Sequence, residues 1–94
     1  MPNINEALTH AKSTMRLALQ DVIGRDPLPA KLEEALGHFA EAKRAGKGER
    51  VAEVAVKTEL NNFAGEVGHK QTLNAAFTAF KTALEEAMGL ARKL

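Results

Sequence analysis

The stretch QTLNAAFTAFKTALEEAMGLARK, residues 71–93, decides the fold class of this chain of 94 residues. Its apolar residues recur at steps of three and four, which places them on one face of an α-helix. The spacing therefore predicts a helix over about 71–93. The predicted buried face consists of Leu73, Phe77, Phe80, Leu84, Ala87 with Met88, Ala91 and, just beyond, Leu94.

A second helix is predicted near the N-terminus, over about 4–23. Asn3 followed by Glu6 resembles a capping box, and Gly24 fits the left-handed position that ends a helix. The apolar residues again step by three and four and form a predicted stripe of Ile4, Leu8, Ala11, Met15, Ala18 with Leu19, and Val22. Leu17 lies away from this stripe.

A third helix is predicted to open at Asp26-Pro27-Leu28-Pro29 and to end near Ala45. Asp26 can cap free backbone N–H groups, and prolines are tolerated in a first helical turn. The cluster Gly46-Lys47-Gly48 then predicts a turn between helices. The predicted stripe consists of Leu28, Leu32, Ala35 with Leu36, Phe39 and Ala42.

The region 49–67 is also predicted to be helical, but it carries two apolar stripes rather than one. The first consists of Val51, Val54, Ala55 and Thr58, and the second of Val56, Leu60, Phe63, Ala64 and Val67. The stripes are offset by roughly a quarter turn or more at about 100° per residue. The helix could wrap around its neighbours, kink near Asn61-Asn62, or bury two faces, and the last arrangement implies a partner.

Composition supports an all-α fold in a single domain, residues 1–94. Ala, Glu, Lys, Leu and Arg make up 51 of the 94 residues, whereas the strand-favouring Val, Ile, Thr and Phe supply only 17. Short connections favour antiparallel neighbours, so the expected architecture is a four-helix up-down bundle. The alternative fuses the predicted helices 49–67 and 71–93 into one long helix that pairs in a dimer.

Charge and cysteine content exclude several classes of protein. The net charge is +1, which lacks the strong positive field of a dedicated nucleic-acid binder. Without cysteine there are no disulfides, thiolate catalysis or Cys-based zinc sites. No apolar run approaches the roughly 18 residues of a membrane span, and the N-terminus lacks the features of a secretory signal. The expected location is therefore cytoplasmic.

Residue patterns that carry chemistry are absent from the sequence. Glu6 with His10, and Glu34 with His38, repeat a Glu-Ala-Leu-x-His pattern. Di-iron helical bundles space Glu and His three apart, so surface pairing explains these spacings of four better than a metal does. We find no acid–base set and no cofactor motif. The sequence predicts a protein that is not an enzyme and has no cofactor, metal or catalytic residues.

A basic cluster lies where the helix ending near Ala45 meets the following turn. It consists of Lys43, Arg44, Lys47 and Arg50, diluted by Glu41 and Glu49. Cations at a helix C-terminus complement the helix dipole, which explains the cluster without a function. The functional alternative is a docking site for an acidic protein surface or for phosphate groups.

A degenerate helix-turn-helix pattern covers about 60–81. Phe63-Ala64-Gly65-Glu66-Val67-Gly68 matches the first helix and turn of such motifs. His69 then stands where an apolar residue is usual, and the would-be recognition helix, 71–81, has no arginine, the commonest reader of guanine. DNA binding is therefore the alternative function.

The leading hypothesis is a small helical protein that acts by protein–protein interaction, as an adaptor, inhibitor or assembly factor. The extra apolar face of the 49–67 helix and the isolated Leu17 are its positive hints. A homodimer would cover both faces of that helix, and two-fold dimers are the commonest assemblies of soluble proteins. The predicted partner-binding residues are Lys43, Arg44, Lys47, Arg50, Val56 and Leu17.

Overall fold

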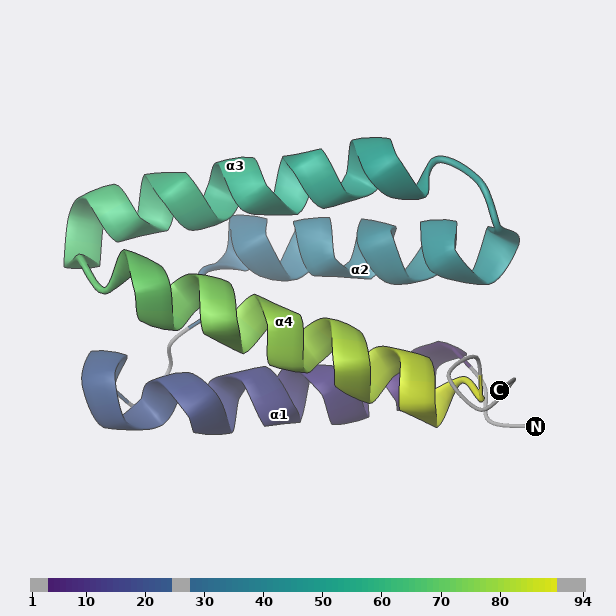
Figure 1. Cartoon of the computed structure of the whole chain (residues 1–94), viewed down its shortest axis with the longest axis horizontal. Coiled ribbons are helices and arrows are strands. Elements are labelled where there is room, and N and C mark those ends of the chain that lie inside the picture. Colours follow the sequence, from purple (N-terminus) through teal and green to yellow (C-terminus); the bar gives the residue numbers. More distant parts are fainter. Residues whose placement is uncertain (1–3, 25–27, 90–94) are drawn as a thin grey trace.

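The protein is a bundle of four helices in a computed structural model that describes residues 4–24 and 28–89. The helices are α1 (Ile4–Ile23), α2 (Ala30–Ala45), α3 (Glu49–Val67) and α4 (Lys70–Ala87). Each runs antiparallel to the one before it (Figure 1). The described residues form no strand, which confirms the predicted all-α up-down bundle.

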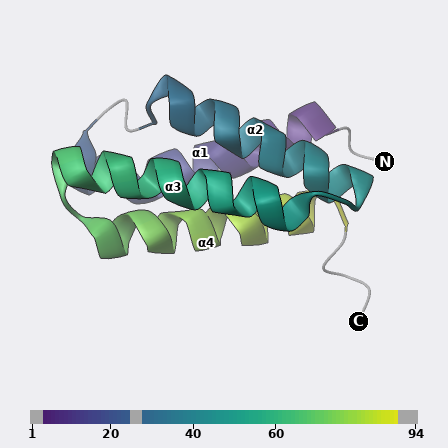
Figure 2. The same cartoon turned by 90° about the horizontal axis from the view of Figure 1, so that it is seen from above.

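The four helices form two closely packed pairs, α1 with α4 and α2 with α3. Smaller contacts of α1 with α2 and of α3 with α4 close the bundle, so α1 and α3 lie at opposite corners (Figures 1 and 2). In the first pair, both helices bury alanines, among them Ala7 and Ala11 of α1 and Ala76 and Ala83 of α4. Such small side chains let helix axes approach closely.

The core is hydrophobic throughout the part of the chain that the structure describes. Its largest aromatic group joins α2 to α4. Phe39 meets Phe77 edge-on with ring centroids 5.6 Å apart, and Phe80 lies 6.3 Å from Phe39 and 6.1 Å from Phe77. Edge-to-face and offset pairs at such distances add stability beyond the area they bury.

Residues with a left-handed backbone separate α2 from α3 and α3 from α4, and the sequence predicts the first of these two turns. Gly46 and Gly48 both have φ of +76°. Between α3 and α4, Gly68 has φ of +77° and His69 has φ of +59°, a conformation in which a helix cannot continue. The alternative of a single helix fused from α3 and α4 is therefore wrong.

Helix bounds and buried faces differ from the prediction in a few places. α4 ends at Ala87 rather than near 93, because Gly89 turns left-handed with φ of +79°. In α1 the buried row is Ala7, Ala11, Met15 and Leu19; the half-buried Ile23 continues it, so Val22 is exposed. Pro29 precedes the first turn of α2 instead of lying in it. The predicted caps at Asn3 and Asp26 and the apolar Ala91 and Leu94 fall outside the described residues.

One apolar stripe of α3 faces the core and the other faces outward. The helix runs uninterrupted from Glu49 to Val67 and turns the second stripe inward, with Val56 and Leu60 fully buried. Phe63 and Ala64 are half-buried, and Val67, at the end of the helix, is 37% exposed. The first stripe faces outward, since the side chains of Val51 and Val54 are 76% and 58% exposed.

Replacing Phe80 with Ala should remove the centre of the aromatic group. Phe80 is fully buried, so we expect unfolding free energy to fall by about 3–5 kcal/mol. Urea denaturation followed by circular dichroism measures the loss, and Thr82→Ala on the exposed face of α4 is the control. A loss below about 1 kcal/mol would mean that this face of α4 is not the core.

Candidate interaction surfaces

The outer face of α3 presents a row of exposed residues at helical spacing. Val51, Val54, Thr58, Asn61 and Gly65 recur at steps of three, four, three and four, and all five are exposed. We call this row the outer strip of α3. Because its steps average three and a half residues, the row follows the seam that a helix presents when it pairs with another helix. Its apolar half is the valine end.

Two residues predicted to bind a partner lie elsewhere. Leu17 is 70% exposed on α1, at the corner of the bundle opposite α3, so it does not join the outer strip. Val56 is fully buried in the core. Its assignment to a partner surface is therefore wrong, because the stripe that it shares with Leu60 packs on the neighbouring helices.

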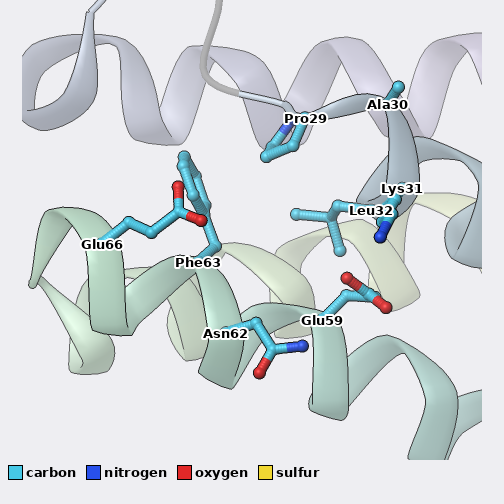
Figure 3. A pocket seen from close by; sticks show the side chains of 8 residues that line it. All are labelled: Pro29, Ala30, Lys31, Leu32, Glu59, Asn62, Phe63 and Glu66. Atoms are coloured by element: carbon cyan, nitrogen blue, oxygen red, sulfur yellow. The ribbon is translucent and has the colours of Figure 1, made fainter.

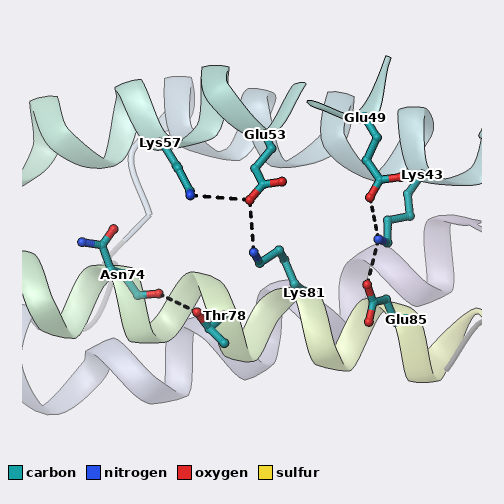
Figure 4. Close-up of polar contacts among 8 residues, drawn as sticks. All are labelled: Lys43, Glu49, Glu53, Lys57, Asn74, Thr78, Lys81 and Glu85. Carbon is teal, nitrogen blue, oxygen red and sulfur yellow. Dashed lines mark hydrogen bonds and ion pairs between the residues drawn. The ribbon is translucent and has the colours of Figure 1, made fainter. Parts of the chain in front are cut away.

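Lys43, the first member of the predicted basic cluster, points inward. Its ammonium group lies 2.7 Å from carboxylate oxygens of both Glu49 and Glu85, so it links α2, α3 and α4 (Figure 4). It also lies 5.7 Å from the centroid of the Phe39 ring. Burial alone would lower the pKa of Lys43, but hydrogen bonds to the two carboxylates outweigh it and raise the pKa.

The other members of the cluster do not form one open patch. The Arg44 guanidinium pairs with Glu41 at 3.0 Å on the surface of α2. Lys47 and Arg50 are exposed and pair with no other described residue. Near the α2–α3 turn, glutamates therefore pair with Lys43 and Arg44, and only the charges of Lys47 and Arg50 are left without a carboxylate partner among the described residues.

A second group of ion pairs lies between α3 and α4. One carboxylate, Glu53, receives Lys81 at 3.2 Å and Lys57 at 3.6 Å (Figure 4). The Lys81 ammonium also lies 5.0 Å from the centroid of the Phe77 ring. The hydrogen bond from Lys81 lowers the pKa of Glu53 and exceeds the opposing effect of burial.

Beside this group, α3 and α4 enclose a shallow cavity of about 320 Å³. We call it the lysine cavity; it is lined by Lys57, Asn61, Lys70, Asn74, Phe77, Thr78 and Lys81. Sequence reasoning missed it and placed the basic site at 43–50 instead. The available signal was a polar row at steps of four and three, Lys70, Asn74, Thr78 and Lys81, on the same helix as the aromatic core residues.

Two other hollows flank α2 and α3. One, of about 200 Å³, has apolar walls from Pro29, Leu32 and Phe63, with the carboxylates of Glu59 and Glu66 beside them (Figure 3). The other, of about 320 Å³, has Ala35 and Ala55 between Glu34, His38 and other polar groups. All three hollows fall at or below the lower end of the roughly 300–1,000 Å³ range of small-molecule sites.

The two Glu–His pairs lie on the surface. Glu6, His10, Glu34 and His38 are all exposed, and no cluster of three or more potential metal ligands occurs within residues 4–24 and 28–89.

Over the same ranges no helix combines the length and apolar character that crossing a membrane would require.

The predicted helix-turn-helix segment forms an antiparallel hairpin. α3 and α4 fold back beside each other across Gly68 and His69 (Figures 1 and 2). In a helix-turn-helix the second helix instead crosses the first at a steep angle. Gln71, Asn74 and Thr78 of the would-be recognition helix are nevertheless exposed.

No known protein family, curated protein or solved structure matches this chain. Its function is therefore inferred from the surfaces described above.

The charge on Glu53 should stabilise the fold in a pH-dependent way. Its pKa is lowered in the folded protein, so the stabilisation is present above the unfolded pKa near 4.5 and is lost as pH falls through the lower folded value. Glu53→Gln should reduce the unfolding free energy by about 0.5–1 kcal/mol at pH 7, as for a partly exposed ion pair.

Urea denaturation at about pH 7 and about pH 2.5 measures the difference between wild type and Glu53→Gln, which should disappear at the lower pH. Glu66→Gln, on the exposed face of the same helix, is the control and should have little effect at either pH. An equal loss at both pH values for Glu53→Gln would show that its charge is not what stabilises the protein.

Proposed function

We propose that this chain is a non-enzymatic helical protein that acts by binding another protein through the outer strip of α3. The exposure of Val51 and Val54, two large apolar side chains one turn apart on the same face, carries this proposal. Isolated exposed apolar residues are common on protein surfaces. Here the valines continue into Thr58, Asn61 and Gly65 along one seam, which suits a helix-to-helix contact.

A second copy of the chain is the first partner that we expect. A seam with coiled-coil spacing on one helix pairs with the same seam of another copy about a two-fold axis. Only the valine end of the outer strip is strongly apolar. The resulting dimer would therefore be reversible and would depend on protein concentration.

Static light scattering at micromolar concentration should report a dimer for the wild-type chain. The double variant Val51→Glu/Val54→Glu should be a monomer with an unchanged helical spectrum, because both side chains point away from the core. Leu17→Glu introduces one such charge on an exposed apolar residue at the opposite corner of the bundle and should remain a dimer. A wild type that stays monomeric, or a double variant that still dimerises, would contradict self-association through this strip.

Binding to a different protein is tested by comparing the same three proteins as baits. Each is incubated with nuclease-treated lysate of the native host, and captured proteins are identified by mass spectrometry. The proposal predicts a partner that wild type and Leu17→Glu retain and that Val51→Glu/Val54→Glu loses. A partner captured equally by all three would not use the outer strip.

A DNA-binding regulator using α3 and α4 is the second candidate function. The exposed Gln71, Asn74 and Thr78 favour it, because Asn74 and Thr78 line the lysine cavity together with its three lysines. Side-chain amides and hydroxyls can contact base edges, while lysines contact phosphates. Electrophoretic shift assays over a range of salt concentrations test it, since phosphate contacts give a steep salt dependence.

A further inference from the structure

We propose that the lysine cavity between α3 and α4 binds a small phosphate-bearing anion. Three of its seven lining residues are lysines, and they come from two helices that the chain brings together across the Gly68–His69 turn. The cavity has a volume of about 320 Å³, enough for a compact ligand. This site is separate from the protein-binding function proposed for the outer strip, which meets it only at Asn61.

The charges around the cavity favour an anion. Lys57 and Lys81 share the single carboxylate of Glu53, and Lys70 forms no ion pair with another described residue. Three positive charges thus meet one negative charge among the ion pairs of the described residues. Glu53 is not among the lining residues and lies to one side, between Lys57 and Lys81 (Figure 4). By binding both ammonium groups it holds them close together beside the cavity.

Neutral hydrogen-bonding groups complete the lining. Asn74 extends from α4 into the space below Lys57 (Figure 4), and Asn61 lies one turn after Lys57 on α3. The Thr78 hydroxyl donates to the backbone carbonyl of Asn74 at 3.2 Å. Amide groups that donate next to ammonium groups are a combination suited to phosphate oxygens.

Helix stability does not explain the position of Lys70. It is the first residue of α4, where a positive charge opposes the helix dipole, and the first turn of α4 contains no acidic residue. Lys70 also forms no ion pair with another described residue. A bound anion would compensate both of these features.

Phosphate fits the donor set better than a carboxylate ligand. A carboxylate carries one negative charge, whereas a phosphate group carries about 1.5 to 2 near pH 7, which better matches the lysine charge that Glu53 leaves uncompensated. Lysine binds phosphate as a point charge from several directions. The buried ring of Phe77 closes the floor and offers no exposed face for a base to stack on, so the lining recognises the phosphate group itself.

The test is a titration of isotope-labelled protein with sodium pyrophosphate, followed by nuclear magnetic resonance at constant ionic strength set with chloride. We expect saturable shifts of the Asn61 and Asn74 side-chain amides. Lys70→Gln should raise the Kd about two- to five-fold, the effect of one exposed charge pair. Lys47→Gln makes the same charge change at the other end of α3, on an exposed residue, and should leave the Kd unchanged.

Three results would overturn the proposal. Shifts that stay linear in pyrophosphate concentration would mean that no site exists. Equal weakening by Lys70→Gln and Lys47→Gln would mean that only the total charge matters. The third result comes from a parallel titration with a short DNA duplex. Shifts of the Asn61 and Asn74 side-chain amides that appear with the duplex but not with pyrophosphate would mean that these lysines bind DNA. Circular dichroism of both variants confirms that they remain folded.

Discussion

Three phenylalanine rings join the two halves of this bundle. Phe39 of α2 packs against Phe77 and Phe80 of α4 across the centre, while the most extensive helix contacts lie within the pairs α1–α4 and α2–α3. The rings therefore supply a contact between the two pairs across the centre, in addition to the smaller α1–α2 and α3–α4 contacts. Their burial also fixes which faces of α2 and α4 point inward.

α3 buries fewer residues than α4 and keeps an apolar face exposed. α4 buries six residues, whereas α3 buries only Val56 and Leu60. Two valines of α3 are left facing outward at 76% and 58% exposure. The proposed protein-binding surface is thus the part of α3 that carries apolar side chains which the core does not bury.

Much of the fold was predictable from sequence because the signals were local. Ile4–Ile23 and Glu49–Val67 were predicted with the bounds that the structure has, since Gly24 and Gly46-Lys47-Gly48 mark the helix ends. The choice between the two stripes of α3 was not predictable, because it depends on which face packs against the neighbouring helices α2 and α4. The end of α4 was misjudged because periodicity continues past Gly89, whose left-handed backbone ends the helix.

The surfaces were harder to predict than the fold, because each depends on residues from several helices. Lys43 belongs to a basic run in sequence, but Glu49 and Glu85 from two other helices engage its charge. The lysine cavity joins residues from 57 to 81 that become neighbours only when α3 and α4 pack together.

The aromatic contact across the centre is tested most directly by nuclear Overhauser spectroscopy on ring-labelled phenylalanine. The structure predicts cross-peaks from Phe39 to both Phe77 and Phe80, because the ring centroids lie 5.6 Å and 6.3 Å apart. Resolved ring signals with no such cross-peaks would contradict this arrangement of the core.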